Sequence, residues 1–190
     1  MIALESLRAE LLVVRMNLNH PNIVQTIGTT TSGREVDDLP FLVMEFAGSR
    51  NLQSVIDDPS EALDAFRRVK FACDICRALD YAHSKGIVHL DVKPANVILD
   101  DTDTCKLGDF GCAQRVGEGD TEFSPSPSIT GTTVYRAPEL LKGFLPQCSA
   151  DMYSMGVVLW TLLTRETPYG AENLQVKTLP LCSNLNSKFH

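Results

Sequence analysis

The sequence predicts an α+β fold, in which a small part with strands precedes a larger, mainly helical part. Three observations support this prediction: the apolar run "FLVMEF" at 41–46, a helical periodicity over 60–85, and an apolar segment at 151–164. The first run has the length of a strand, and the other two have the length of helices. We place the division at about residue 47, where the glycine-containing break "AGSRN" begins.

The N-terminal part predicts one helix followed by strands. Residues 4–18 have the spacing of an amphipathic helix, and Glu5 and Glu10 within the apolar stretch exclude a secretory signal. Pro21 in "HPNIV" ends this helix and leads into a strand. The run at 41–46 is the next strand.

A long helix is predicted over 60–85, beginning at Pro59-Ser60 and ending at Gly86. Its predicted apolar stripe, at three- or four-residue steps, consists of Phe66, Val69, Cys73, Cys76 and Leu79. Cys73 and Cys76 form a Cys-x-x-Cys pair with no second pair nearby. We therefore predict core packing for both thiols, in preference to a zinc or redox site.

The second half alternates short strands with polar loops. Ile87-Val88 and Val97–Leu99 read as buried strands, and "CKLGDF" forms another after the turn "DTDT". Residues 115–131 are rich in Gly, Ser and Pro, which predicts a mobile surface loop. The segment 151–164 is apolar almost all round and predicts a central, buried helix.

Composition limits the possible functions. The chain has 190 residues, 44% of them apolar, and a formal net charge of −7, which argues against a nucleic-acid surface. No apolar run approaches the length of about 20 residues that spans a bilayer. The six cysteines are scattered along the chain, so we expect reduced thiols and a cytoplasmic protein.

Polar groups interrupt the apolar runs at three places. "HLDVKPAN" lies between two predicted strands, "GDFG" follows at 108–111, and "GTTVYRAPELL" comes twenty residues later. A loop that holds Asp, Lys and Asn at fixed offsets on a rigid scaffold is typical of a catalytic site.

Taken in order, these motifs resemble the signature of the eukaryotic protein kinases. The resemblance implies a bilobal, protein-kinase-like fold that is truncated at both ends. Residues 1–47 would be a partial small lobe with its hinge, 48–170 a partial, mainly helical large lobe, and 171–190 an irregular tail. The Gly-rich phosphate loop and the Ala-x-Lys strand of the family do not occur in the sequence.

The resemblance assigns chemical roles in phosphoryl transfer from ATP. Asp91 would accept or orient the substrate hydroxyl, and Lys93 would neutralise the transferring phosphoryl group. Asn96 and Asp109 would supply hard oxygen ligands to Mg²⁺. Thr132 would bridge Asp91 and Lys93, and, like Lys93-Pro94, it favours a Ser/Thr acceptor over tyrosine.

The nucleotide site follows from the same resemblance. Met44 would guard the back of the adenine pocket, and Ile98 would form its floor. The backbone carbonyl of Glu45 and the backbone amide of Ala47 would bond the adenine edge. Asn51, just past the hinge, completes the predicted nucleotide contacts.

Further positions are assigned structural or regulatory roles. Glu10 matches the helix glutamate that pairs with the family's strand lysine, although an ordinary exposed carboxylate is the alternative. Phe110 would pack under that helix, and Gly111 would let the backbone turn. The remaining assigned positions are His89, Glu139, whose Arg partner would lie past the end of the sequence, and Asp151.

Leu90 narrows the choice of kinase family, because in most kinases this position is an Arg that binds an activation-loop phosphate. "HLDVKPANVIL", "GDFGC" and "TPYG" are most similar to the Mos serine/threonine kinases. That similarity implies a cytosolic kinase whose protein substrate is a MAP kinase kinase in oocyte meiosis. The net charge and the lack of a spanning apolar run predict no nucleic-acid or membrane partner. Two alternatives stay open: a catalytically incompetent, kinase-like binding module, with residues 1–190 inactive alone, or a kinase of another Ser/Thr family.

Overall fold

The computed structural model describes residues 2–29, 41–116 and 133–170. Its helices are α1 (Ile2–Arg15), α2 (Leu52–Asp57), α3 (Ala65–Ser84), α4 (Pro138–Leu141) and α5 (Cys148–Thr164). Its strands are β1 (Thr26–Thr29), β2 (Leu42–Met44), β3 (Arg50–Asn51), β4 (Ile87–Val88), β5 (Val97–Leu99), β6 (Cys105–Leu107) and β7 (Gln114–Arg115). Two 3-10 turns, η1 (Pro94–Asn96) and η2 (Thr133–Tyr135), complete the described elements. This mixture confirms the predicted α+β fold.

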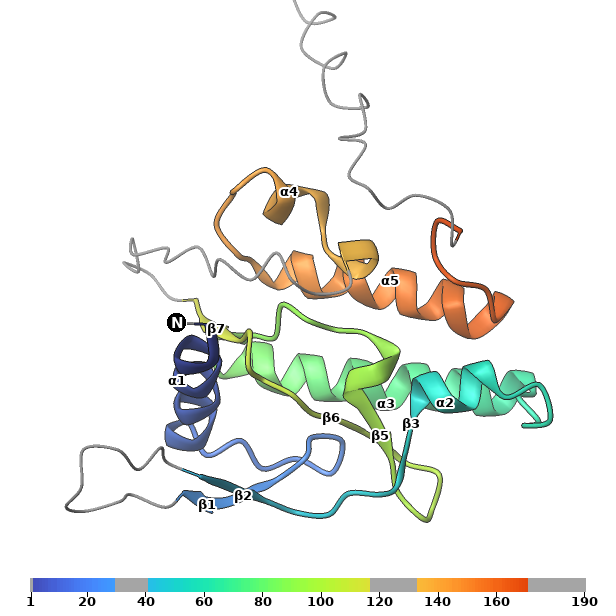
Figure 1. Cartoon of the computed structure of the whole chain (residues 1–190), viewed down its shortest axis with the longest axis horizontal. Helices are drawn as coiled ribbons and strands as arrows, with labels where there is room; N and C mark the ends of the chain where they lie inside the picture. Colours follow the sequence, from blue (N-terminus) through green and yellow to red (C-terminus); the bar gives the residue numbers. More distant parts are fainter. Residues whose placement is uncertain (1, 30–40, 117–132, 171–190) are drawn as a thin grey trace, which may run out of the picture.

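Three small antiparallel sheets organise the strands: β1–β2, β3–β5–β6 and β4–β7. In Figure 1, α3 and α5 run side by side, and β6 lies against α3. The N-terminal part is attached to β6 through the "HPNIV" segment. The Val24 amide donates to the Leu107 carbonyl at 2.9 Å, and the Leu107 amide donates to the Asn22 carbonyl at 2.8 Å. Backbone pairing therefore fixes α1 and its loop beside the central strands.

The ends of α3 test the predicted helix boundaries. Asp64 caps the helix, because its carboxylate accepts the Arg67 amide at 2.8 Å, so the predicted start at Ser60 is wrong. Residues 60–64 instead form a turn and an irregular segment between α2 and this cap. The predicted end is confirmed: Gly86 has φ +70°, and its amide donates to the His83 carbonyl at 2.9 Å.

The buried face of α3 differs from the predicted stripe. It consists of Phe71, Asp74, Ile75, Ala78, Leu79 and Ala82. Phe66 and Val69 are 80% and 61% exposed, and the thiols Cys73 and Cys76 are also exposed. The prediction that both cysteines pack in the core is therefore wrong. The helix carries two apolar stripes, and packing against β6 and α5 selects the one that contains Phe71.

The helix α5 also has only one buried face. Its buried side chains are Ala150, Asp151, Ser154, Met155, Val158, Thr161 and Leu162. Its exposed apolar side chains are Met152, Tyr153, Leu159, Trp160 and Leu163. The prediction of a helix buried all round is thus wrong for the described structure. The strand run at 41–46 is also shorter and more exposed than predicted, and only Leu42–Met44 form β2.

Several predictions fall on residues that the structure does not describe. Most of the loop predicted at 115–131, the whole tail at 171–190, and Thr132 lie outside the described residues. Among the helices that are described, none combines the length and the apolar character that a membrane span requires.

Candidate active site

The loop between β4 and β5 gathers three of the predicted side chains. Lys93 Nζ lies 2.7 Å from Asp91 Oδ2, and Asn96 Nδ2 donates to both the backbone carbonyl and Oδ2 of Asp91 at 2.9 Å. The side chains of Asp91 and Lys93 keep 18% and 16% of their surface exposed. The Asp91 carboxylate is therefore held by two donors while it remains within reach of solvent.

A second loop, which carries "GDFG", is bonded to the first. The Gly108 amide donates to the Asn96 carbonyl at 2.9 Å, and His89 Nε2 donates to the Gly108 carbonyl at 3.0 Å. A carbonyl only accepts, so Nε2 carries the proton, and His89 Nδ1 accepts the Asp91 amide at 3.2 Å. The fully buried His89 thus ties the two loops together with both of its ring nitrogens.

Asp151, at the start of α5, holds the backbone of the loop that carries Asp91. It is fully buried; its Oδ2 accepts the His89 amide and its Oδ1 accepts the Leu90 amide, each at 2.8 Å. His83 Nε2, from α3, lies 2.8 Å from the same Oδ2. Leu90 has φ +66°, an unfavourable conformation for a residue with a side chain, and the bond to Asp151 holds it there.

The loops provide oxygen atoms that fit a hard cation. Asp109 is exposed and has φ +56°, and within the described residues its carboxylate accepts only the Gly111 amide of its own turn, at 3.3 Å. Asn96 uses its Nδ2 for Asp91, and its Oδ1 accepts no hydrogen bond from the described residues. A carboxylate and an amide oxygen are ligands that Mg²⁺ accepts while it keeps several waters or phosphate oxygens. In the same residues no group of three or more His, Cys, Asp or Glu could hold a metal by itself.

The helix α1 packs directly on the second loop. Burial, followed by the charge of Asp109, raises the pKa of Glu10 to about 7, and the nearby Phe110 backbone opposes this shift only in part. No Lys or Arg among the described residues forms an ion pair with Glu10. Phe110 is buried, with its ring centroid 4.6 Å from that of His89. A Cβ at Gly111 would overlap the Ser6 hydroxyl, so a larger residue there would force the Ser6 side chain to move.

The predicted nucleotide residues lie in β2, in the segment predicted to be the hinge, in β3 and in β5. Met44 ends β2 and is 46% exposed. Ile98 pairs with Asn51 on one side and with Lys106 on the other, in the sheet β3–β5–β6. Lys106 Nζ in turn lies 2.8 and 2.9 Å from the two carboxylate oxygens of Glu45. This ion pair attaches the hinge to the sheet.

Three of the predicted residues remain to be placed. Ala47 lies two positions after Glu45 and is half-buried, whereas Phe46 between them is exposed. The side-chain oxygen of Asn51 accepts the Ser54 amide at 2.9 Å and thereby caps α2. Glu139 lies in the first turn of α4, and in the described part of the chain no basic residue forms an ion pair with it.

Comparison with known proteins identifies the family of this chain. Residues 2–187 match the family model described as "Protein kinase domain". The chain belongs to the protein kinase family. A serine/threonine-protein kinase mos of Patiria pectinifera is 54% identical over 162 residues, which are 84% of this chain and 46% of that relative. A proto-oncogene serine/threonine-protein kinase mos of Sus scrofa is 38% identical over 191 residues, or 93% and 54% of the two chains.

A third relative extends the same pattern. The serine/threonine-protein kinase mos of Gallus gallus is 36% identical over 197 residues, which cover 95% of this kinase chain and 56% of the relative. The chain therefore spans about half the length of the curated relatives it matches. The name mos belongs to those relatives.

Sequence reasoning missed three contributors to this candidate site. His83 bonds to Asp151 across 68 positions, and Lys106 bonds to Glu45 across 61. Ser6 lies against Gly111. Neither His83 nor Lys106 belongs to a motif with fixed spacing, because each reaches its partner only after the chain has folded.

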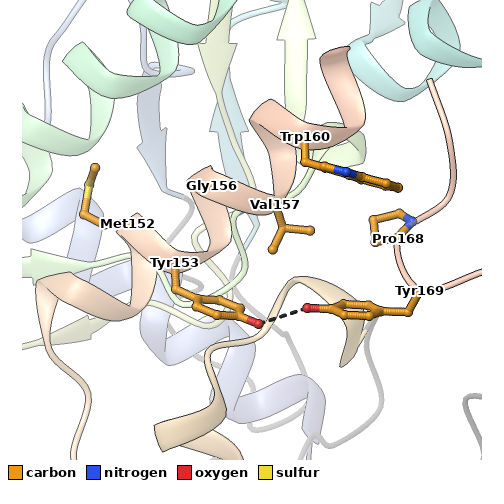
Figure 2. Close-up of a pocket in the computed structure, with 7 residues that line it drawn as sticks. All are labelled: Met152, Tyr153, Gly156, Val157, Trp160, Pro168 and Tyr169. Atoms are coloured by element: carbon orange, nitrogen blue, oxygen red, sulfur yellow. Dashed lines mark hydrogen bonds between the residues drawn. The ribbon is translucent and has the colours of Figure 1, made fainter. Parts of the chain in front are cut away.

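A cavity beside α5 lies apart from the loops that carry Asp91 and Asp109. It has a volume of about 460 Å³ and is lined by Met152, Tyr153, Gly156, Val157, Trp160, Pro168 and Tyr169, as Figure 2 shows. Only the hydroxyls of Tyr153 and Tyr169, 3.0 Å apart, bond each other across it. That bond, followed by burial, raises the pKa of Tyr153 to about 12. The lining contains none of the predicted site residues and no charged group.

Proposed function

We propose that this chain forms the catalytic-loop part of a protein serine/threonine kinase, which transfers the γ-phosphoryl group of ATP to a protein hydroxyl. The observation that carries the proposal is the convergence of Lys93 and Asn96 on the Asp91 carboxylate, in a loop bonded to the one that carries Asp109. Phosphoryl transfer depends on such positioning and on charge neutralisation more than on covalent chemistry.

Each of these side chains has a proposed role. Asp91 Oδ2 would accept the proton of the substrate hydroxyl or orient it, and Lys93 would divide its charge between Asp91 and the transferring phosphoryl group. Asn96 and Asp109 would hold Mg²⁺, which supplies neutralisation of the phosphate charge when bound. Thr132 would bridge Asp91 and Lys93.

The other predicted residues would bind the nucleotide or set the geometry. Met44, the backbone of Glu45 and Ala47, Asn51 and Ile98 would form the adenine side of the site. Glu10, His89, Phe110, Gly111, Glu139 and Asp151 would maintain the arrangement of the loops. In this proposal residues 1–47 belong to the small lobe, 48–170 to the large lobe, and 171–190 form a tail.

The finer assignment rests on the likeness to the Mos kinases. The acceptor would be Ser or Thr, as Lys93-Pro94 and the names of the relatives suggest. The protein substrate would be a MAP kinase kinase in oocyte meiosis, and the protein would act in the cytoplasm. Leu90 carries no charge, so activity would not require a phosphate on the loop that follows Arg115.

A binding-only role is the second candidate. It is favoured by Glu10, whose pKa is raised by burial and by Asp109 and which pairs with no basic side chain among the described residues. Without such a partner, Glu10 forms no ion pair that could hold a basic group beside the phosphates of ATP. Under this reading residues 1–190 by themselves would bind ATP weakly and dock partners without turnover.

The test measures transfer of labelled phosphate from Mg·ATP to a MAP kinase kinase and to a generic Ser/Thr substrate. The enzyme is the protein expressed from its whole gene, compared with Asp91→Asn and with Asp101→Asn, a control at an exposed turn. We expect Asp91→Asn to lose at least a hundredfold and the control to keep full activity. Equal activity of the parent and Asp91→Asn would refute the kinase proposal, and nucleotide binding without transfer would support the binding module.

A further inference from the structure

Two free thiols lie one turn apart on the outer face of α3. Cys73 and Cys76 are both exposed, whereas Asp74 and Ile75 between them are 4% and 1% exposed and point into the core. Residues three apart on a helix are neighbours, with Cβ atoms about 5–6 Å apart. The two sulfurs also influence each other, because burial and then the charge of Cys73 raise the pKa of the Cys76 thiol.

The helix opposes a direct disulfide between these residues. A disulfide requires a Cβ–Cβ separation of about 3.5–4.5 Å, less than the helical spacing provides. The helix is 20 residues long, Asp64 caps its start, and Phe71 and Ile75 anchor its buried face, so the backbone is not free to adjust. A single atom bonded to both sulfurs spans a wider gap than a sulfur–sulfur bond and leaves the helix intact.

The surroundings define what that atom can be. Among the described residues no third His, Cys, Asp or Glu completes a metal cluster with the pair, so the bound centre must be satisfied by two sulfurs. Val69 and Phe66, 61% and 80% exposed, continue the same face toward the start of α3. They provide apolar surface for an organic group carried by the bound atom.

We propose that Cys73 and Cys76 form a vicinal-dithiol site on α3 that binds monosubstituted trivalent arsenicals and related thiophilic centres with two open positions. With an aryl arsenoxide the two S–H bonds break, two As–S bonds form, and both protons leave with the oxide oxygen as one water. Arsenic stays trivalent and neither sulfur is oxidised, so no oxidant is required. This site is separate from the Asp91 loop and does not depend on kinase activity.

The test adds phenylarsine oxide to the reduced 190-residue chain and reads the intact mass, with circular dichroism to follow helix content. We expect one adduct per chain, unchanged helix content, and release by a dithiol but not by excess monothiol. Cys73→Ser and Cys76→Ser should each weaken binding by at least tenfold. Cys148→Ser, at a partly buried thiol on α5, is the matched control and should bind as the parent does.

Three outcomes would overturn the proposal. The first is that the parent binds no arsenical, and the second is that the serine variants at Cys73 and Cys76 both bind as tightly as the parent. The third is that binding occurs only when the helix content falls. If either serine variant is poorly folded by circular dichroism, peptide mapping of the parent adduct decides instead. An adduct mapped to any other pair of cysteines would then refute the assignment.

Discussion

Replacing Asp151 by Asn should destabilise the protein without changing the volume of the side chain. The carboxylate is fully buried and accepts three hydrogen bonds, from the His89 and Leu90 amides and from His83 Nε2. An asparagine offers one acceptor oxygen in place of two. Whichever way the amide is turned, its NH₂ group faces a donor, and at least one buried N–H loses its partner.

The magnitude follows from the contacts. A buried donor without a partner costs about 1–3 kcal/mol, and the bonds that remain lose the roughly twofold strength that a charged acceptor confers. The strain of the Leu90 conformation, φ +66°, is about 1–2 kcal/mol in the parent already, so it does not add to this difference. We therefore expect Asp151→Asn to lower the free energy of unfolding by about 2–4 kcal/mol. For a domain of this size that corresponds to a Tm lowered by about 5–15 °C.

The assay is urea unfolding followed by circular dichroism, combined with hydrogen exchange of the backbone amides. Asp80→Asn, at an exposed position of α3, is the control and should change stability by less than about 0.5 kcal/mol. Protection of the His89 and Leu90 amides should fall in Asp151→Asn more than protection of amides in the middle of α3. A variant within about 1 kcal/mol of the parent, with both amides still protected, would refute the reasoning.

Three further predictions use the same approach. Because the pKa of Glu10 is raised from 4.5 to about 7 in the folded chain, the native state holds this proton more tightly and stability falls as pH rises through that interval. The free energy of unfolding of Glu10→Gln should equal that of the parent near pH 4 and exceed it near pH 8 by about 1–2 kcal/mol, after a discount for solvent screening. A variant that is as stable as the parent at both pH values would contradict this prediction. Lys106→Met should cost about 0.5–1 kcal/mol in urea unfolding, and a double-mutant cycle with Glu45→Gln that gives no coupling would disprove the ion pair's contribution. Arg67 donates to both carboxylate oxygens of Asp103 at 2.7 Å, and a lysine cannot make this bidentate contact. Arg67→Lys should therefore lower the free energy of unfolding by about 1 kcal/mol more than Arg77→Lys, whose side chain is largely exposed, and thermal melts of the two variants would measure the difference.

The sequence by itself determined the features that depend on neighbours along the chain. The end of α3 at Gly86 followed from the need for a left-handed residue after a helix, and the structure confirms it. The convergence of Lys93 and Asn96 on Asp91 is also local, because Asn96 lies only five positions after Asp91. Fixed spacing in one short loop is enough to bring such side chains together.

Only the tertiary structure decided features that depend on distant partners. Periodicity showed that α3 has an apolar stripe, but contact with β6 and α5 selected the face of Phe71 and left Cys73 in solvent. The site depends in the same way on Asp151, whose bonds to His89 span 62 positions and rest on the packing of α5 against α3. Burial and long-range pairing are properties of the folded chain, and for that reason no local pattern could specify them.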